Sequence, residues 1–119
     1  MYRGTENART AKWISENKKP CIIVGYGESM TPILQSGQPV IVAPVLPDTT
    51  IRKNDIVFCR VNGHYYLHKV YAVKKGDRYT IGNNHGHING TIGRRNIFGL
   101  VIRRLKKLDI MNNSADFDE

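Results

Sequence analysis

The chain has 119 residues, which is enough for one hydrophobic core but too few for two comfortable ones. Gly, Pro, Val, Ile and Tyr are frequent among its residues, a mix that favours short strands and turns and excludes a helical bundle. The net charge of +8 favours acidic partners, namely nucleic acid, an anionic membrane surface or an acidic protein.

Other composition features narrow the class of protein further. No apolar run approaches the ~20 residues that cross a bilayer, and the N-terminus lacks the apolar core of a signal peptide. We therefore expect a soluble, cytoplasmic protein without a membrane span. Cys21 and Cys59 lie in apolar runs and are expected to be buried free thiols. The histidines lack the spacing of a zinc site, so we expect no metal or cofactor, although His85 and His87 leave a metal site open.

The first predicted element is a helix over residues 5–18, with Thr5 as its cap and Pro20 as its stop. Two buried strands are predicted next, at 21–26 and 38–45. The clearest pattern covers 55–73, where two strands flank Asn62-Gly63, a dipeptide that suits a two-residue hairpin turn.

The remaining strands follow the same pattern. A turn at Gly76-Asp77 leads into a strand that ends near Asn83, Asn89-Gly90 suits another turn, and a last strand is predicted within 96–108. We therefore predict a single, mostly β domain of short antiparallel strands over 1–119. It comprises an N-terminal helix within 1–19, a β core over 20–107 and an acidic flexible tail over 108–119.

Residues 25–42, GYGESMTPILQSGQPVIV, raise a question about Ser29. Gly, Ser and Pro all bend chains, so the segment alone suits a turn. A serine hydroxyl acts as a nucleophile only when a neighbouring base takes its proton. The candidate bases are His64, His68, Lys69, Lys74 and Lys75. On an ideal strand His64 and His68 share one face and Lys69 lies on the other, and a histidine on such a mixed face is more often structural than catalytic.

Four segments between residues 20 and 104 together resemble the motifs of one peptidase superfamily. GESMTPILQSGQPVIV resembles the first motif, with Gly27, Ser29, Met30 and Pro32 in its key places. KNDIVFCRVNGHYYLHKV resembles the second motif, YTIGNN the third and NIFGLVI the fourth. In this order the set resembles the signal peptidase and LexA-type serine peptidases.

The resemblance implies a mostly β peptidase fold and a role for several residues. Ser29 matches the nucleophile. His68 matches the base, which is a lysine in bacterial signal peptidases and LexA-type proteins but a histidine in the endoplasmic-reticulum and archaeal-type enzymes. The chain therefore resembles the Ser-His branch, and Lys69 falls in the place of an arginine. Backbone amides from Gly27 to Met30 would form the oxyanion hole.

The chain also departs from the family pattern. Its third motif reads Gly82-Asn83-Asn84 without the family's aspartate, and the place of a further aspartate that orients the histidine falls near Asn89. We therefore expect Asn89 or Asn83 to orient His68, with less stabilisation of the imidazolium than an acid gives. Glu28 would raise the pKa of His68 if the two lie close.

Further family features are missing from the sequence. It shows no apolar anchor helix, no small residue-Gly bond before Ser29 and no helix-turn-helix domain. We therefore expect neither membrane-bound secretion chemistry nor repressor self-cleavage, but a soluble peptidase that stands alone.

Two functions are predicted from these observations. The first is a soluble serine endopeptidase that cuts a protein substrate in trans, bound as an extended strand, with Ser29 as nucleophile and His68 as general base. The alternative is a catalytically weak or inactive peptidase fold that binds a protein complex or nucleic acid through a basic patch. The patch comprises Arg94, Arg95, Arg103, Arg104, Lys106 and Lys107. No aromatic RNA-binding motif supports nucleic acid, and the oligomeric state stays open.

Overall fold

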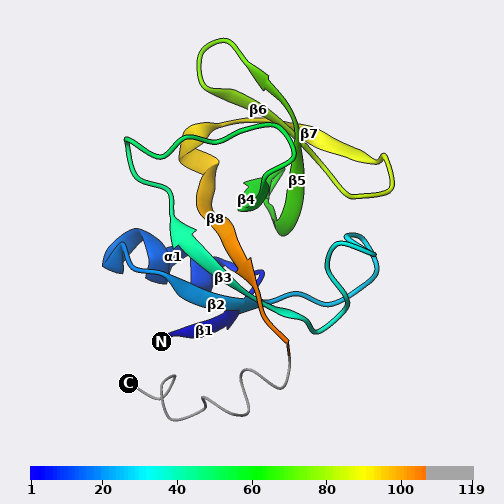
Figure 1. Ribbon diagram of the computed structural model, residues 1–119. Coiled ribbons are helices and arrows are strands. Elements are labelled where there is room, and N and C mark those ends of the chain that lie inside the picture. Colours follow the sequence, from blue (N-terminus) through cyan, green and yellow to red (C-terminus); the bar gives the residue numbers. More distant parts are fainter. Residues whose placement is uncertain (107–119) are drawn as a thin grey trace.

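In the computed structural model, which describes residues 1–106, eight strands form one curled sheet with a single α-helix against it (Figure 1). The strands are β1 (Arg3–Thr5), β2 (Cys21–Val24), β3 (Pro39–Pro44), β4 (Ile56–Val61), β5 (His64–Lys74), β6 (Arg78–Gly82), β7 (Ile88–Gly93) and β8 (Ile97–Arg104). The helix is α1 (Ala8–Asn17), and a short 3-10 turn, η1 (Arg94–Asn96), precedes β8. The predicted mostly β class with one N-terminal helix is confirmed. The predicted tail over 108–119 lies outside the described residues.

The sheet has the strand order β1-β2-β3-β8-β4-β5-β6-β7. The pairing of β1 with β2 is parallel and every other pairing within residues 1–106 is antiparallel. The last strand, β8, inserts between β3 and β4 and so joins the N-terminal strands to the β4–β7 meander. The two hairpin turns are confirmed. Asn62-Gly63 is a two-residue turn between the paired residues Val61 and His64, and both of its residues have positive φ. Gly76 and Asp77 also have positive φ, in a three-residue turn over 75–77.

The start of the chain differs from the prediction. Thr5 ends β1 and pairs with Val24, so it is not the helix cap. Asn7 caps α1 instead, because its Oδ1 accepts the Thr10 N–H at 3.0 Å. Three residues of β1 gave no period-2 signal, since the strand forms only by pairing with β2.

A second difference concerns residues 88–93. Asn89-Gly90 was expected to form a turn, but both residues lie within β7, which pairs with β6. Gly90 has a positive φ of +156°, which L side chains rarely adopt and which glycine tolerates within the strand. Tertiary pairing with β6 therefore decides the local structure over the turn preference of the dipeptide.

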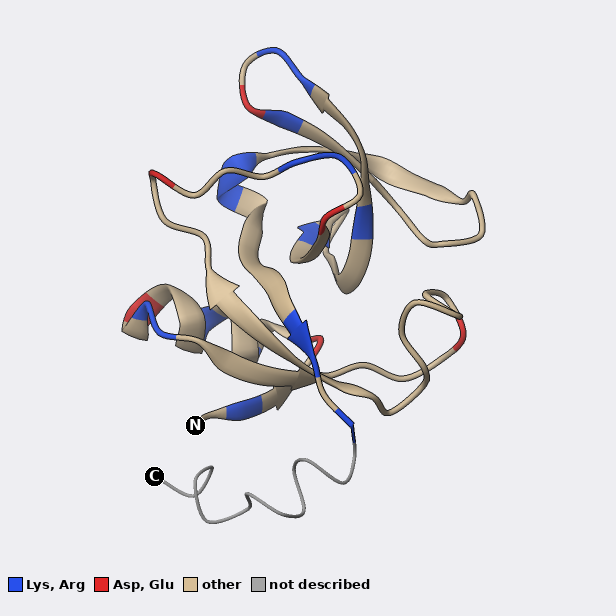
Figure 2. Cartoon of the chain, in the orientation of Figure 1, with Lys and Arg blue, Asp and Glu red and all other residues tan. Residues whose placement is uncertain are grey.

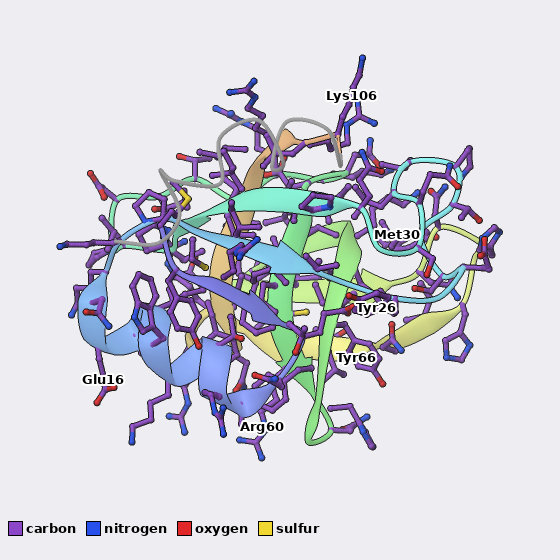
Figure 3. The ribbon with its side chains drawn as sticks, turned by 90° about the horizontal axis from the view of Figure 1, so that it is seen from below. Glu16, Tyr26, Met30, Arg60, Tyr66 and Lys106 are labelled. Carbon is purple, nitrogen blue, oxygen red and sulfur yellow. The ribbon has the colours of Figure 1, made fainter. Side chains whose placement is uncertain are left out.

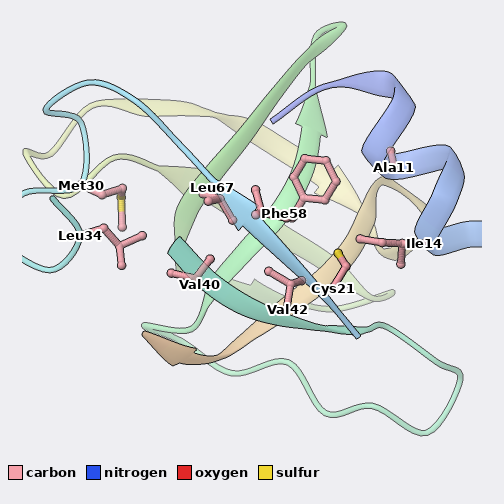
Figure 4. Packing of buried hydrophobic residues seen from close by; sticks show 10 residues of the cluster. Ala11, Ile14, Cys21, Met30, Leu34, Val40, Val42, Phe58 and Leu67 are labelled. Atoms are coloured by element: carbon pink, nitrogen blue, oxygen red, sulfur yellow. The ribbon is translucent and has the colours of Figure 1, made fainter. Parts of the chain in front are cut away.

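The buried side chains form two clusters that lie on opposite faces of β4. Phe58 belongs to the first cluster, which extends from α1 to the loop before β3 (Figure 4). Its neighbours Val57 and Cys59 belong to the second, which β5, β6 and β7 complete. Cys21 and Cys59 are buried free thiols, as predicted, and burial raises their pKa to about 11 and about 12.

Candidate active site

Ser29 lies in the loop over residues 25–38, which connects β2 to β3. Gly27, with a φ of +107°, turns the chain where an L side chain would be strained. Directly after Ser29, the side chains of Met30 and Leu34 are buried in the first core cluster, and the Leu34 N–H donates to the Met30 oxygen at 2.9 Å. Figure 4 shows both side chains at the end of the cluster that lies away from α1. The loop is thus anchored next to Ser29, which fixes the position of its hydroxyl.

His68 comes from the middle of β5, where the strand pairs with β4 through Val57. It is 5% exposed, and its ring stacks on that of Tyr66 with the centroids 4.5 Å apart. The Nε2 atom lies 3.3 Å from the Oγ of Ser29. The Nδ1 atom lies 2.7 Å from the Oδ1 of Asn89 on β7. The fold therefore brings Ser29, His68 and Asn89 into one hydrogen-bonded chain from three separate segments.

The partners of His68 decide which ring nitrogen carries its proton. The amide oxygen of Asn89 accepts, so Nδ1–H donates to it and Nε2 is left as the acceptor for the Ser29 hydroxyl. Burial is the main influence on the pKa of His68 and lowers it, with a smaller lowering from His87 and an opposing rise from the Asn89 hydrogen bond. The neutral ring is thus favoured, which is the form that can accept a proton.

Glu28 does not act on His68 as the sequence led us to expect. Its side chain is exposed, and it is not among the groups that shift the pKa of His68, which is lowered and not raised. The backbone oxygen of Glu28 instead accepts hydrogen bonds from the Thr31 hydroxyl at 2.9 Å and lies 2.9 Å from Nε2 of His85. Glu28 therefore helps to stabilise the loop through its backbone oxygen, and burial, not Glu28, is the main influence on the pKa of His68.

The loop over residues 83–87 holds the Ser29 loop in place from the other side. The Asn84 N–H donates to the backbone oxygen of Ser29 at 2.8 Å, and its side-chain amide donates to the Thr31 oxygen at 3.0 Å. The two loops lie on the same side of the molecule (Figure 1). The sequence places Asn84 in the third motif but does not predict its role in holding the Ser29 loop.

Asn83 does not meet His68. Its Oδ1 accepts the backbone N–H groups of His85 and His87, at 2.8 and 3.0 Å, and so closes the 83–87 loop on itself. Of the two asparagines that were expected to orient the histidine, the structure brings only Asn89 to it. Asn83 follows β6 directly, where the chain must turn, and this explains why its side chain bonds to the local backbone.

Among residues 1–106, no hydrogen bond joins Lys69 to the Ser29 hydroxyl. Its Nζ donates to Asn84 Oδ1 at 3.2 Å and lies 4.7 Å from the centroid of the Tyr71 ring. Lys69 therefore supports the loop that holds Ser29. The side chain beside the serine hydroxyl is the histidine.

The backbone N–H groups around Ser29 differ in their availability. The Gly27 N–H donates to the Ser36 hydroxyl at 2.9 Å, so it is already engaged. Within residues 1–106 no group accepts a hydrogen bond from the N–H of Ser29 or of Met30. These two amides, and not that of Gly27, have the capacity to bind an oxyanion in this loop.

A small pocket, the Ser29 pocket, opens beside Ser29. Its lining includes Glu6, Gly25, Met30, Leu34 and Leu67. Glu6 is a site residue that sequence reasoning missed, because a single acid between two short elements gives no pattern. Burial raises the pKa of its carboxyl above the ordinary value, although backbone hydrogen bonds from Leu67 and Tyr26 partly oppose that rise.

The predicted basic patch is divided in the structure. Arg94 and Arg95 belong to η1, at the start of β8, whereas Arg103 and Arg104 lie at its far end (Figure 2). Arg94 donates to the backbone oxygens of residues 46, 47 and 49, and Arg104 donates to the Ile33 oxygen at 3.2 Å. These two guanidinium groups therefore support neighbouring loops. Lys106 is exposed, and Lys107 lies outside the described residues.

Comparison with known proteins identifies the family of the chain. A model of the Peptidase S24-like family matches residues 5–102, which is most of the chain. The chain belongs to the Peptidase S24-like family. The predicted resemblance to this peptidase superfamily is thereby confirmed, and Ser29, His68 and Asn89 all lie within the matched residues. No curated protein gives a significant match to the sequence.

Residues 1–106 also bear on two other kinds of site. None of the helices in this range is long and apolar enough to cross a membrane. The same residues hold no group of three or more His, Cys, Asp and Glu side chains that could bind a metal ion.

Proposed function

We propose that this Peptidase S24-like protein is a serine endopeptidase in which Ser29 is the nucleophile and His68 the general base. The observation that carries the proposal is the hydrogen-bonded chain from Asn89 through His68 to Ser29, at 2.7 and 3.3 Å. It supplies the two contacts that an activated serine needs: a base within reach of the hydroxyl and a partner that orients the base.

The reaction follows from the hydrogen-bonding capacity of each group. Ser29 Oγ attacks the carbonyl carbon of the substrate while its proton passes to Nε2 of His68. The N–H groups of Ser29 and Met30 stabilise the oxygen that becomes negative. His68 then gives its proton to the leaving amine, and water hydrolyses the acyl-enzyme by the same route. The 3.3 Å contact is longer than a strong hydrogen bond, as is common before substrate is bound.

The substrate is proposed to be a separate polypeptide that binds as an extended strand. β5 pairs with β6 only from Lys69 onward, so residues 64–68 have a strand neighbour on the β4 side alone within the described part of the chain. This open edge ends at His68, and an added strand would therefore carry its carbonyl groups past Ser29.

A labelling experiment tests the proposal. We expect a fluorophosphonate probe, which reacts with activated serine hydroxyls, to label the wild-type protein and not Ser29→Ala. His68→Ala should reduce the labelling rate by about 100-fold, the usual contribution of a general base. His64→Ala is the matched control, since His64 is an exposed histidine on the same strand and should leave the rate unchanged.

Two results would contradict the peptidase proposal. One is labelling that persists in Ser29→Ala, and the other is a labelling rate that His68→Ala and His64→Ala leave equally unchanged.

Substrate cleavage is tested by a second assay. A library of unlabelled peptides, incubated with wild type and with Ser29→Ala, should yield fragments with the wild type alone.

The alternative function, a binding module that uses the basic residues, stays a prediction. Its support is weakened because these residues lie at both ends of β8 and two of them are bonded to backbone oxygens. Binding through phosphate contacts would show an affinity that falls steeply with salt concentration.

A further inference from the structure

The carboxylate of Glu6 is a part of the Ser29 pocket that the proposed reaction does not use. Glu6 lies between β1 and α1, and its side chain reaches the pocket that Ser29 also lines. Its Oε2 accepts the Leu67 N–H at 2.7 Å, and its carboxylate also has a backbone hydrogen bond with Tyr26. One carboxylate thus contacts the backbone of both segments that border the site, β5 and the 25–38 loop.

The Leu67 N–H is the donor that the open edge of β5 offers next to His68. The N–H bonds to the Glu6 carboxylate and not to a neighbouring strand. An extended substrate that bonds along this edge would use the same donor through one of its own oxygens. Glu6 therefore occupies a position in the path of such a substrate, and the substrate either ends at Glu6 or contacts it.

The surroundings of Glu6 hold a negative charge without neutralising it. A Cβ atom at Gly25 would lie 2.2 Å from Glu6 Oε1, so the glycine makes the room that the carboxylate needs. Among residues 1–106, the hydrogen bonds of Glu6 come from neutral backbone N–H groups of Leu67 and Tyr26, which bring no positive charge. A partly buried carboxylate of this kind gains most from a cation that hydrogen-bonds to it.

We propose that Glu6 makes the Ser29 pocket selective for substrates that present a primary ammonium group beside the bond to be cut. The ammonium is either the end of a Lys side chain, which suits an endopeptidase, or a free N-terminal amine, in which case the cut would lie next to the end of a chain. The inference rests on the proposed peptidase function and adds a substrate class to it. The charge also sets the direction of the substrate, because a terminal amine is attracted to Glu6 and a terminal carboxylate is repelled.

Peptide binding to the Ser29→Ala protein tests this inference without a need for cleavage. The probes are pentaalanine amide with a free amine, its N-acetylated form, and acetylated versions whose central residue is Lys or Met. Binding to ¹⁵N-labelled protein at pH 7.5 is followed through the amide signals of Leu67 and Tyr26. We expect at least one ammonium-bearing peptide to bind about tenfold more tightly than its neutral counterpart, as a charge-assisted hydrogen bond allows. The free-amine and Lys peptides separate the two sources of the ammonium.

Two variants decide whether Glu6 is responsible. Glu6→Gln keeps an oxygen for the Leu67 N–H but removes the charge, and we expect it to abolish the preference. Glu16→Gln removes the same charge from the exposed face of α1, far from Tyr26 and Met30 (Figure 3), and should keep the preference. Glu6→Gln keeps an acceptor for Leu67 but places an NH2 group, which cannot accept, on the other side, so thermal unfolding is measured to check that the variant is folded.

Three outcomes would overturn the inference: equal affinity for charged and neutral peptides, no binding of any probe, or a Glu6→Gln variant that binds every probe more tightly. In the last case Glu6 only blocks the edge of β5. The peptidase proposal fails separately. If wild-type protein binds ammonium peptides selectively but cleaves none of the peptide library, the cation site stands and the peptidase proposal falls.

Discussion

Asn89 sets the tautomer of His68 but adds no negative charge. Its amide oxygen accepts the Nδ1–H, which leaves Nε2 free for the Ser29 hydroxyl. In an acid-containing triad the carboxylate also stabilises the imidazolium that forms when the histidine takes the proton. The proposed site thus has the orientation of a triad with only part of its electrostatic stabilisation, which predicts a working but slow peptidase.

An acid at position 89 should therefore speed the proposed reaction. We expect Asn89→Asp to raise kcat/KM at pH 8 by roughly tenfold or more, because the carboxylate stabilises the imidazolium. Burial lowers the pKa of His68 in the parent, so its kcat/KM should fall only as the pH drops below the ordinary value for histidine, about 6.5. The added negative charge raises that pKa and should move the fall in activity to higher pH.

The matched control for this change is Asn83→Asp. Asn83 lies near the site but bonds to the backbone of His85 and His87, not to His68. A pH–rate profile of all three proteins is the measurement. If Asn83→Asp moves the acid limb as far as Asn89→Asp does, the direct Asn89–His68 contact does not govern the pKa of the base.

At the scale of elements, two loops that are distant in sequence depend on each other. The 83–87 loop supplies Asn84, which donates hydrogen bonds to the backbone oxygens of Ser29 and Thr31. Its Oδ1 accepts a hydrogen bond from the Lys69 ammonium. The Ser29 loop is thus fixed by the core on one side and by the 83–87 loop on the other. A change at the base of the second loop should therefore reach the nucleophile.

Gly82→Ala is predicted to break this link. A Cβ atom at Gly82 would lie 2.4 Å from the His87 oxygen and 2.8 Å from a ring carbon of Tyr71, so the 83–87 loop must move. We expect a loss of stability of about 1–3 kcal/mol, typical of overpacking, and a fall in kcat of about tenfold or more from the displaced Ser29 loop. Thermal unfolding and steady-state kinetics measure the two effects.

Gly93→Ala provides the comparison for that variant. A Cβ atom at Gly93 meets nothing within 4 Å, and its φ of −81° suits any L residue, so stability and activity should both be retained. Equal kinetics for Gly82→Ala and Gly93→Ala would show that the position of the 83–87 loop does not matter to Ser29.

The elements also show what the sequence can predict and what it cannot. The hairpin at Asn62-Gly63 was predicted correctly because a local dipeptide dictates its backbone. β1 and β7 were missed because both depend on a partner strand elsewhere in the chain. The proximity of Ser29 and His68 was inferred from family resemblance alone, since no local pattern encodes a contact across 39 residues. The positions of Glu6 and Asn84 could not be inferred, because they result from how separate loops pack.

At the scale of the whole molecule, β4 connects the two hydrophobic clusters. Phe58 faces one cluster, while Val57 and Cys59 face the other. Loss of either cluster would leave one face of β4 exposed to water. The site depends on both, because Met30 anchors the Ser29 loop in the first cluster and His68 lies on β5, whose Val70 is buried in the second.

The shared strand predicts that residues 1–106 unfold in one cooperative transition. We expect Phe58→Leu in the first cluster and Ile81→Val in the second each to lower the free energy of unfolding by about 1 kcal/mol. Both substitutions should lower the Tm of the same transition. Val73→Ala, at a side chain that is 50% exposed, should leave the Tm nearly unchanged. Differential scanning calorimetry is the measurement, and equal calorimetric and van't Hoff enthalpies would mark a single transition. Two transitions, each moved by only one of the core substitutions, would mean that the clusters unfold independently and that Ser29 and His68 belong to separable units.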